Sequence, residues 1–203
     1  MKNKNNSFEI INGKNNVIVS APHNETHIRN KKIKKKDLGS GHLLLDVVNK
    51  TSSFGMIKTN LKGEGNINDD DPNYQKECEY KNELLSLIKN NNIKAFIDIH
   101  SLKKSRPTQI NLGINNGVNI KENFKVLEKI KELFSKEGYL VSIDKPFFAG
   151  EKTLSSFVFK EANIFSLQIE INSKLIHLKD ERNEFSKISK ILSNVVMLIN
   201  KSL

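Results

Sequence analysis

Three stretches of the sequence end on side chains that could bind a metal ion or move a proton. They are Pro22-His23, Asp98-Ile99-His100 and the segment 168–172, which contains Glu170. Two histidines and one carboxylate, with a fourth position open to water, form the usual shell of a hydrolytic zinc site. Zinc in such a site polarises a carbonyl and lowers the pKa of water, so hydrolysis needs no serine or cysteine nucleophile. A second carboxylate nearby could pass the proton to a leaving amine.

Each of these stretches closes a segment that has the pattern of a strand. Residues 17–20 form an apolar, β-branched run that Pro22 terminates, and residues 95–100 form a second short run. Residues 165–172 alternate between apolar and polar side chains, as a strand does. Because ligands of open α/β sheets collect at the carboxyl ends of strands, we expect the three stretches to meet at one edge of a sheet.

The strand predicted over residues 165–172 leaves two interpretations open. Its polar side chains, Glu170 included, share one face, and a half-exposed strand at a sheet edge gives the same pattern. If the strand is central instead, the ionised carboxylate of Glu170 needs a partner, which favours a functional role. Asp98 precedes His100 by two residues and therefore faces the same way, so it could orient that histidine from behind.

Strand and helix patterns alternate along the rest of the chain, which predicts a single α/β domain over residues 1–203 with a mostly parallel sheet. The first 15 residues are polar and are expected to be frayed or to form an edge hairpin around Gly13. Residues 61–73 have the composition of a long loop. The predicted helices are 41–49, with Ser40 as a possible N-cap, 75–90, 122–136, 154–161 and 182–201, and the further predicted strands are 54–59, 108–115 and 139–143.

The chain has 203 residues and a net charge of +10, and its densest basic cluster is the lysine-rich segment 31–36. Basic proteins often bind nucleic acid, but aromatic residues make up 7% of this chain and tryptophan is absent, which leaves few platforms for base stacking. We interpret the segment as a solvated face or as a positive field that attracts an anionic substrate. A non-catalytic nucleic-acid-binding protein is the alternative.

The sequence gives little reason to expect a membrane or secreted protein. No apolar run approaches the roughly 20 residues that a membrane helix needs, and no apolar signal core follows the basic N-terminus. The single cysteine, Cys78, excludes an internal disulfide and fits a reducing compartment, so we expect a cytoplasmic location. Cys78 lies between two glutamates, which disfavours a nucleophilic thiolate.

Taken in order, the polar motifs resemble those of N-formylglutamate amidohydrolase-like proteins over residues 17–172. The motifs that carry the resemblance are Ser20-Ala21-Pro22-His23, Arg29, Asp37-x-x-Ser40-Gly41, Asp71-Pro72-Asn73, Asp98-Ile99-His100, Arg106 followed by Ile110-Asn111-Leu112-Gly113, Pro146-Phe147 and Leu167-Gln168-Ile169-Glu170-Ile171.

This resemblance implies a fold similar to that of zinc carboxypeptidases and acylases, a three-layer α/β/α sandwich. It also implies a metal-dependent amidohydrolase that acts on the amide of an acidic amino acid, such as N-formylglutamate. Carried over to this sequence, His23, Asp37 and His100 would be the metal ligands. Glu170 would be the general base and acid. Zinc is the expected ion, although manganese or iron would accept the same ligands.

The resemblance also assigns substrate contacts. Arg29 and Arg106 would grip a substrate carboxylate, which a guanidinium matches bidentately. Asn73 would hydrogen-bond that carboxylate or the scissile carbonyl. Three positions depart from the family pattern. Asn24-Glu25 follows the first histidine where glycine or serine is usual, which makes Glu25 a rival metal ligand, Tyr74 stands where an arginine is common, and the loop at residues 146–150 lacks the arginine that commonly follows it. Lys152 could replace an arginine that is missing from the loop before it.

The remaining ligand-type residues have simpler interpretations. His42 and His177 are expected at the surface, His27 is expected to be a bystander in the motif loop, and the acidic run at residues 68–71 reads as a solvated turn. The expected partner is a small acidic N-acyl amino acid or a short peptide. Within enzymes, a zinc peptidase acting on γ-glutamyl or cell-wall peptides is the alternative, and a relative that keeps the metal shell without turnover is another.

Overall fold

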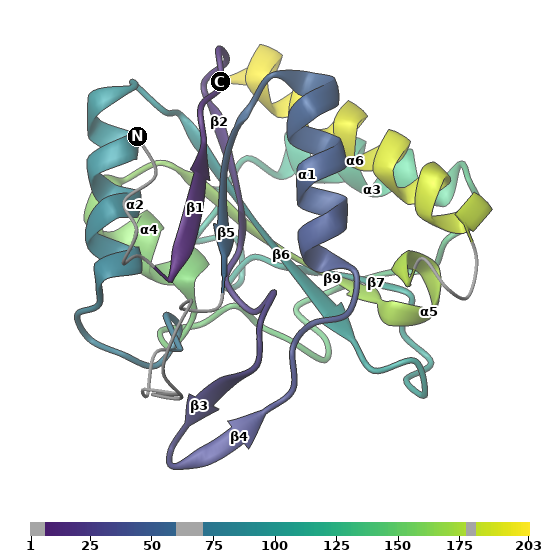
Figure 1. Ribbon diagram of the computed structural model, residues 1–203. Coiled ribbons are helices and arrows are strands. Elements are labelled where there is room, and N and C mark those ends of the chain that lie inside the picture. The colour runs from purple at the N-terminus through teal and green to yellow at the C-terminus, as the bar shows by residue number, and fades with distance from the viewer. Residues whose placement is uncertain (1–6, 60–70, 178–181) are drawn as a thin grey trace.

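The computed structural model describes residues 7–59, 71–177 and 182–203 and has an α/β fold (Figure 1). Its main sheet has seven strands in the order β1-β5-β2-β6-β9-β7-β8. β2, β5, β6 and β9 run parallel, β1 is antiparallel to β5, β7 is antiparallel to β9, and β8 is parallel to β7. The strands are β1 (Phe8–Ile11), β2 (Val17–Ala21), β5 (Phe54–Lys58), β6 (Ala95–Leu102), β7 (Ile110–Gly113), β8 (Val141–Ile143) and β9 (Phe165–Asn172).

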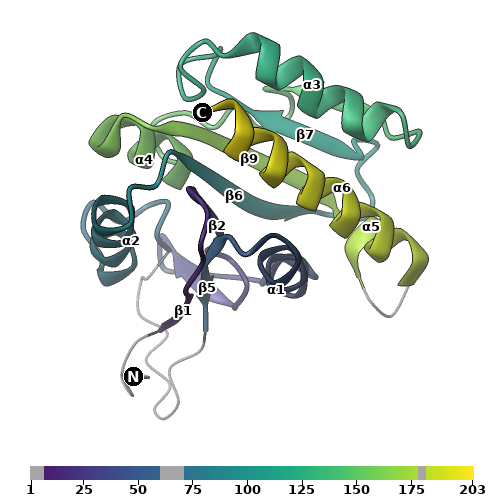
Figure 2. The ribbon, with the colours of Figure 1, turned by 90° about the horizontal axis from the view of Figure 1, so that it is seen from above.

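Helices cover both faces of this sheet, which confirms the predicted three-layer α/β/α sandwich (Figure 2). One face carries the larger apolar core, and the other carries a smaller one. The larger core is covered by α1 (Ser40–Thr51), α3 (Phe124–Ser135), α5 (Ser173–Ile176) and α6 (Arg182–Ser202), and the smaller by α2 (Glu79–Asn90) and α4 (Leu154–Ala162).

The central strands change character along their length, and this change creates the site. On the face toward α2 and α4, the amino-terminal halves contribute apolar side chains such as Ile18 and Phe96. Closer to the carboxyl ends, the same face carries buried polar side chains, including Ser20, His100 and Glu170. Because side chains alternate along a strand, the opposite face is apolar over most of its length, with Ser101 near the end of β6 as an exception. The polar end of one sheet face is therefore available for chemistry.

β9 lies between β6 and β7, and all its residues are buried. The interpretation of residues 165–172 as an exposed edge strand is therefore wrong. The N-terminal segment also differs from expectation, because Phe8–Ile11 forms an edge strand paired with β5 and does not form a hairpin around Gly13.

The lysine-rich segment was expected to be a loop. Instead, residues 32–34 form one strand of a second, two-stranded sheet. β3 (His27–Arg29) pairs with β4 (Lys32–Lys34) in an antiparallel hairpin, which lies at the lower end of the molecule in Figure 1. The two turn residues, Asn30 and Lys31, both have positive φ, at 52° and 59°. Two left-handed central residues define a tight turn whose twist suits a hairpin, and asparagine tolerates that conformation.

Two helix starts also differ from the prediction. α1 is capped by Gly39, whose φ is 84°, and not by Ser40, whose hydroxyl donates instead to the carbonyl of Asp37 at 3.0 Å. α2 begins at Glu79, four residues later than expected. Among the described helices, none is both long and apolar enough to cross a membrane.

Candidate metal centre

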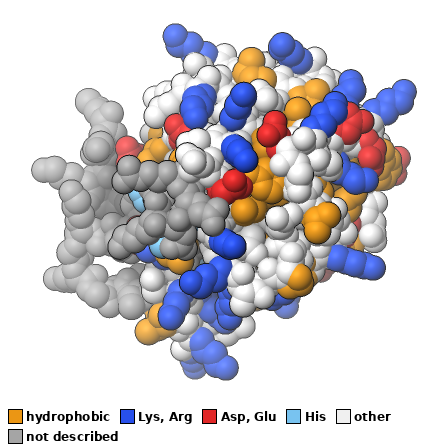
Figure 3. All heavy atoms as spheres, turned by 90° about the vertical axis from the view of Figure 1, so that its right-hand side faces the viewer, with side chains coloured by type: hydrophobic (Ala, Val, Ile, Leu, Met, Phe, Trp, Pro, Cys, Tyr) orange, Lys and Arg blue, Asp and Glu red, His pale blue; other side chains and the backbone are white. Residues whose placement is uncertain are grey.

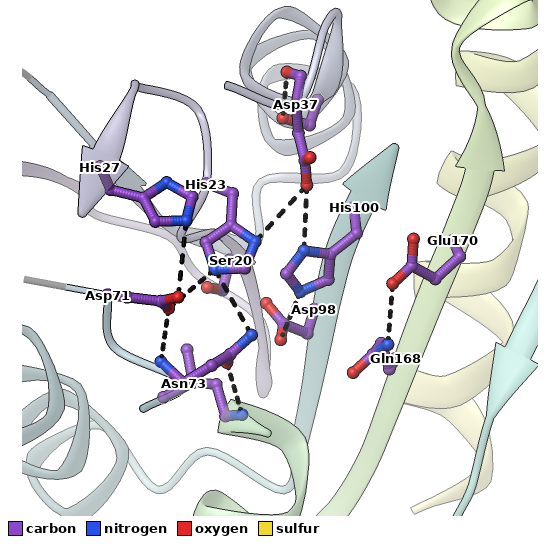
Figure 4. A network of polar contacts seen from close by, with 12 residues as sticks. Ser20, His23, His27, Asp37, Asp71, Asn73, Asp98, His100, Gln168 and Glu170 are labelled. Carbon is purple, nitrogen blue, oxygen red and sulfur yellow. Dashed lines mark hydrogen bonds and ion pairs between the residues drawn. The ribbon is translucent and has the colours of Figure 1, made fainter. Parts of the chain in front are cut away.

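The predicted chemical residues lie at the carboxyl ends of three neighbouring strands (Figure 4). His23 follows β2 by two residues, His100 lies in β6, and Glu170 lies in β9. The helix after β2 covers one face of the sheet, and the helix before β6 covers the other. Open α/β sheets bind ligands in the crevice at the carboxyl ends of two adjacent strands whose connecting helices lie on opposite faces of the sheet.

Asp37 brings the two histidines together. One of its oxygens, Oδ2, lies 3.0 Å from Nδ1 of His100 and 3.7 Å from Nδ1 of His23. The ligand atoms of these three residues all lie within 4.8 Å of one another, close enough for one metal ion. The backbone N–H of Asp37 donates to the carbonyl of His23 at 2.8 Å, which fixes the segment before α1 against the end of β2.

The other ring nitrogen of each histidine is held by a second carboxylate. Nε2 of His23 lies 2.9 Å from Oδ1 of Asp71, and Nε2 of His100 lies 3.0 Å from Oδ2 of Asp98. Metal-binding histidines usually donate their other N–H to a carboxylate, which fixes the tautomer and the ring orientation. Both Nδ1 atoms face Asp37, and an imidazole that keeps its proton on Nε2 could donate the electron pair of Nδ1 to a metal ion.

These buried pairs shift the pKa values of their members in opposite directions. Burial alone would lower the pKa of His23, but hydrogen bonds to Asp37 and Asp71 raise it above its ordinary value. Burial likewise acts to lower the pKa of His100, but Asp98 and Asp37 raise it well above the usual range. Burial would raise the pKa of Asp37, whereas its histidine partners hold it far below the ordinary value. Without a metal, the cluster favours charged histidines beside charged aspartates.

Asp71 is part of the site, although its sequence position did not lead us to expect a role for it there. It is 1% exposed, whereas it was expected in a solvated turn. Its carboxylate contacts His23, accepts from Nε of Arg29 and accepts from the backbone N–H of Asn73 at 3.0 Å. The rest of the predicted acidic turn, residues 68–70, lies outside the described residues. The motif Asp71-Pro72-Asn73 was the available signal, but the acidic neighbours masked it.

His27 is also part of the site, although it was expected to be a bystander. It is 2% exposed, and its ring stacks on His23 with the centroids 4.5 Å apart. His23, His27 and Asp71 form a second group that is compact enough for a metal ion. Arg29 donates to Asp71 in this group, and a guanidinium at that position repels a cation. The group around Asp37 therefore fits a divalent ion better.

Glu170 lies beside this cluster without being a member of either ligand group. It is 6% exposed, and one of its oxygens accepts from Nε2 of Gln168 at 3.0 Å. Burial raises the pKa of Glu170 to about 7, an increase that the cationic form of His100 opposes and the charge of Asp37 adds to. A carboxyl with a pKa near neutral pH can both accept and donate a proton there.

The other expected residues occupy different positions around the centre. Glu25 belongs to neither ligand group among the described residues. Asn73 lines the cavity, with its Nδ2 3.4 Å from Nε2 of His23, but its Oδ1 accepts from the N–H of Leu154 and thereby also anchors α4. His42 is exposed and His177 is half-buried, and neither lines the cavity. Burial raises the pKa of Cys78, in agreement with its expected inertness.

The centre opens into a cavity of about 810 Å³ whose lining is strongly basic. Arg29 stacks on Tyr74 at one side, and Arg106 lies over the ring of Phe147 at another, 5.3 Å from its centroid. Lys152 also lines the cavity. Figure 3 shows Lys and Arg side chains over much of the drawn face, with one group low on that face, not far from the pale blue histidines. Such a field attracts anions.

Comparisons with known proteins identify the fold. Neither the family models nor the curated proteins match this sequence. Among solved structures, N-formylglutamate amidohydrolase from Ralstonia eutropha JMP134 matches with a TM-score of 0.66 and 13% identity, over 97% of this chain and 97% of that one. A bacteriophage poly-gamma-glutamate hydrolase matches with a TM-score of 0.60 and 14% identity, over 94% of this chain and 88% of that one. A metallo-carboxypeptidase from Burkholderia cenocepacia matches with a TM-score of 0.54 and 12% identity, over 92% of this chain and 57% of that one.

At these identities the likeness shows the fold alone. The chain has the architecture of the amidohydrolase that its motifs resemble, so the predicted fold relationship is confirmed. Reaction and substrate do not follow from a shared fold, and they rest on the residues of the site.

Proposed function

We propose that this protein is a metal-dependent amidohydrolase that cleaves the amide of an N-acyl acidic amino acid, of which N-formylglutamate is the simplest. His23, Asp37 and His100 would hold the metal, and Glu170 would move the protons. One observation carries the proposal: two imidazole Nδ1 atoms converge on one carboxylate oxygen, next to a buried carboxyl with a pKa of about 7.

The donor set fits a divalent transition metal. Two imidazoles and one carboxylate make the three-ligand shell of a catalytic zinc site, and Asp71 and Asp98 hold the imidazoles from behind. When bound, the metal supplies Lewis acidity, which polarises the scissile carbonyl and lowers the pKa of water. Zinc fits best, and other divalent ions share the preference for these ligands.

Glu170 would act first as base and then as acid. It takes one proton from water as the water oxygen bonds to the carbonyl carbon, and it gives that proton to the leaving nitrogen as the C–N bond breaks. The products are a carboxylic acid and an amine. The hydrogen bond from Gln168 to one carboxylate oxygen leaves the other oxygen available for the proton. General acid–base transfer of this kind contributes about 10²–10⁴-fold to a rate.

The cationic cavity supports an anionic substrate. Arg106 is exposed and has no carboxylate partner among the described ion pairs, so its guanidinium can bind a substrate carboxylate. Arg29 is already paired with Asp71. It would therefore add positive charge to the cavity, whereas its guanidinium is less available for a bidentate contact with the substrate. The same groups suit a peptidase of γ-glutamyl or cell-wall peptides, which would differ in the size of the acyl part. Placement of the cations around the centre favours an anionic substrate over a nucleic-acid surface.

Metal content and turnover test the proposal together. We expect about one zinc per chain in the wild type and loss of that zinc in His23→Ala and His100→Ala. Glu170→Gln should keep the metal and lose hydrolysis of N-formyl-L-glutamate. His42→Ala, at an exposed helical histidine, is the matched control and should keep both. A wild type that binds no zinc when supplied with it would overturn the proposal.

A further inference from the structure

The site residues form a row across the sheet, and this row gives the substrate a direction. β2, β6 and β9 are adjacent, so His23, His100 and Glu170 follow one another from the β2 end to the β9 end. The metal ligands lie at the β2 and β6 positions, and Glu170 lies at the β9 position. Because Glu170 must reach the leaving nitrogen, the leaving amino acid extends toward β9 and the acyl group extends toward β2.

Cations are present at the β9 end, where the leaving amino acid would lie. The loop after β6 brings Arg106 there, since its carbonyl accepts at 2.9 Å from Nδ2 of Asn172, the last residue of β9. Lys103, on the same loop, also lines the cavity. An acidic leaving group, as in the proposed function, accounts for these two cations.

A larger group of cations lies at the other end, where the acyl group would lie. The β3–β4 hairpin follows β2, and Lys34, Lys35 and Lys36 at its exit all line the cavity. Among the described lining residues, the only acidic ones are Asp37 and Glu170. Asp37 is engaged by both histidines and Glu170 lies on β9, so no carboxylate among the described lining residues is left to balance the three lysines. A formyl group carries no negative charge that could pair with these lysines.

We propose that the acyl part of the substrate is itself anionic, so that the enzyme cleaves an amide that joins two carboxylate-bearing groups. The carboxylate of the acyl chain binds Lys34–Lys36 of the hairpin side, and the acidic amino acid binds on the side of Arg106. This inference rests on the proposed function and narrows it: N-formylglutamate becomes a minimal, slow substrate. The β3–β4 hairpin becomes the element that sets specificity.

A matched pair of substrates tests the inference. N-glutaryl-L-glutamate and N-pentanoyl-L-glutamate have the same leaving group and acyl length and differ in one terminal carboxylate. We expect kcat/KM for the glutaryl compound to be at least tenfold higher in the zinc-loaded enzyme. The triple variant Lys34→Gln/Lys35→Gln/Lys36→Gln should remove this preference, and added salt should weaken it. The variant Lys125→Gln/Lys129→Gln/Lys160→Gln, at exposed lysines outside the cavity, carries the same charge change and should keep the preference.

Binding to Glu170→Gln separates this inference from the proposed function. Calorimetry with the two compounds should show at least tenfold tighter binding of the glutaryl compound, lost in the hairpin triple variant. Glutaryl preference in binding without wild-type turnover of either compound would overturn the proposed reaction, and with it the cleavage, and would keep only the assignment of Lys34–Lys36 as the binding site for the acyl carboxylate. Equal turnover and equal affinity for the two compounds would overturn the inference and keep the reaction. If neither compound binds, both the proposed reaction and the inference are overturned.

Discussion

His100 and Glu170 lie directly opposite each other on the adjacent parallel strands β6 and β9. The register of two buried strands therefore sets the distance between His100, a proposed metal ligand, and Glu170, the proposed proton carrier. A slip of one residue would turn Glu170 to the opposite face of the sheet, into the apolar core. Placing both groups on central strands is more precise than placing them on loops, which suits a reaction that needs alignment within fractions of an ångström.

Asp37 and Glu25 give opposite expectations for metal binding. Asp37 contacts both histidines, so Asp37→Asn should weaken zinc binding by more than 100-fold, because it removes the charged ligand. Glu25→Gln should leave zinc affinity within about threefold of the wild type, because Glu25 lies in neither ligand group. Competition with a chromogenic chelator measures both affinities. Loss of zinc in Glu25→Gln with retention in Asp37→Asn would reverse the ligand assignment.

Asp71 should control zinc affinity without binding zinc. It holds Nε2 of His23, and removing such a partner typically costs about 10–100-fold in metal affinity. We therefore expect Asp71→Asn to weaken zinc binding by about that factor while keeping one site per chain. The control is His27→Ala, which removes a ligand of the rival group and should change affinity less than Asp71→Asn does. If His27→Ala abolishes binding while Asp37→Asn does not, the metal lies in the rival group.

The sequence predicts the fold and the strand-end residues more completely than the groups that support them. Alternating patterns locate β2, β6 and β9 because each strand repeats a period that sequence displays directly. Asp71 and His27 are harder to assign in this way, since their burial depends on contacts with His23, and the one local signal, the motif at residues 71–73, lies in an acidic run. The β3–β4 hairpin was missed because its lysines resemble a solvated cluster, while its turn depends on two left-handed residues.

Glu170 should make the metal-free protein less stable at alkaline pH. Its pKa is raised from 4.5 to about 7, so between these values the unfolded chain loses its proton first and stability falls as the pH rises. Above pH 7 the ionised, buried carboxylate costs on the order of 3 kcal/mol relative to the unfolded chain. We expect Glu170→Gln to raise the free energy of unfolding by about 1–3 kcal/mol at pH 8, with a smaller effect at pH 5.

Urea unfolding in the presence of a chelator measures this effect at both pH values. Glu128→Gln, at an exposed position of α3, is the control and should change stability by less than about 0.5 kcal/mol. A Glu170→Gln protein that is no more stable than the wild type at pH 8 would show that Glu170 is not buried as an unfavourable charge. The expected gain in stability together with lost turnover is the signature of a strained functional group.

Gly41 allows α1 to approach the loop that carries His23. A Cβ atom at Gly41 would lie 1.9 Å from Oδ1 of Asn24, the residue after His23, so a larger side chain must displace the Asn24 side chain, whose amide donates to the carbonyl of Lys58 at 3.0 Å. Alanine normally stabilises a helix by about 1 kcal/mol relative to glycine. Here we expect Gly41→Ala to lower the free energy of unfolding by about 1–3 kcal/mol, because the steric cost exceeds the gain in helix propensity. Zinc affinity should fall as well, because the displaced Asn24 is the chain neighbour of His23.

Gly138→Ala separates this steric effect from a general effect of losing a glycine. A Cβ at Gly138 meets nothing within 4 Å, and only its φ of 85° opposes alanine. The control should therefore cost about 1 kcal/mol of stability and leave zinc affinity unchanged. If Gly41→Ala is as stable as the wild type and binds zinc equally well, the close approach of α1 to the His23 loop is not what holds the metal ligand in place.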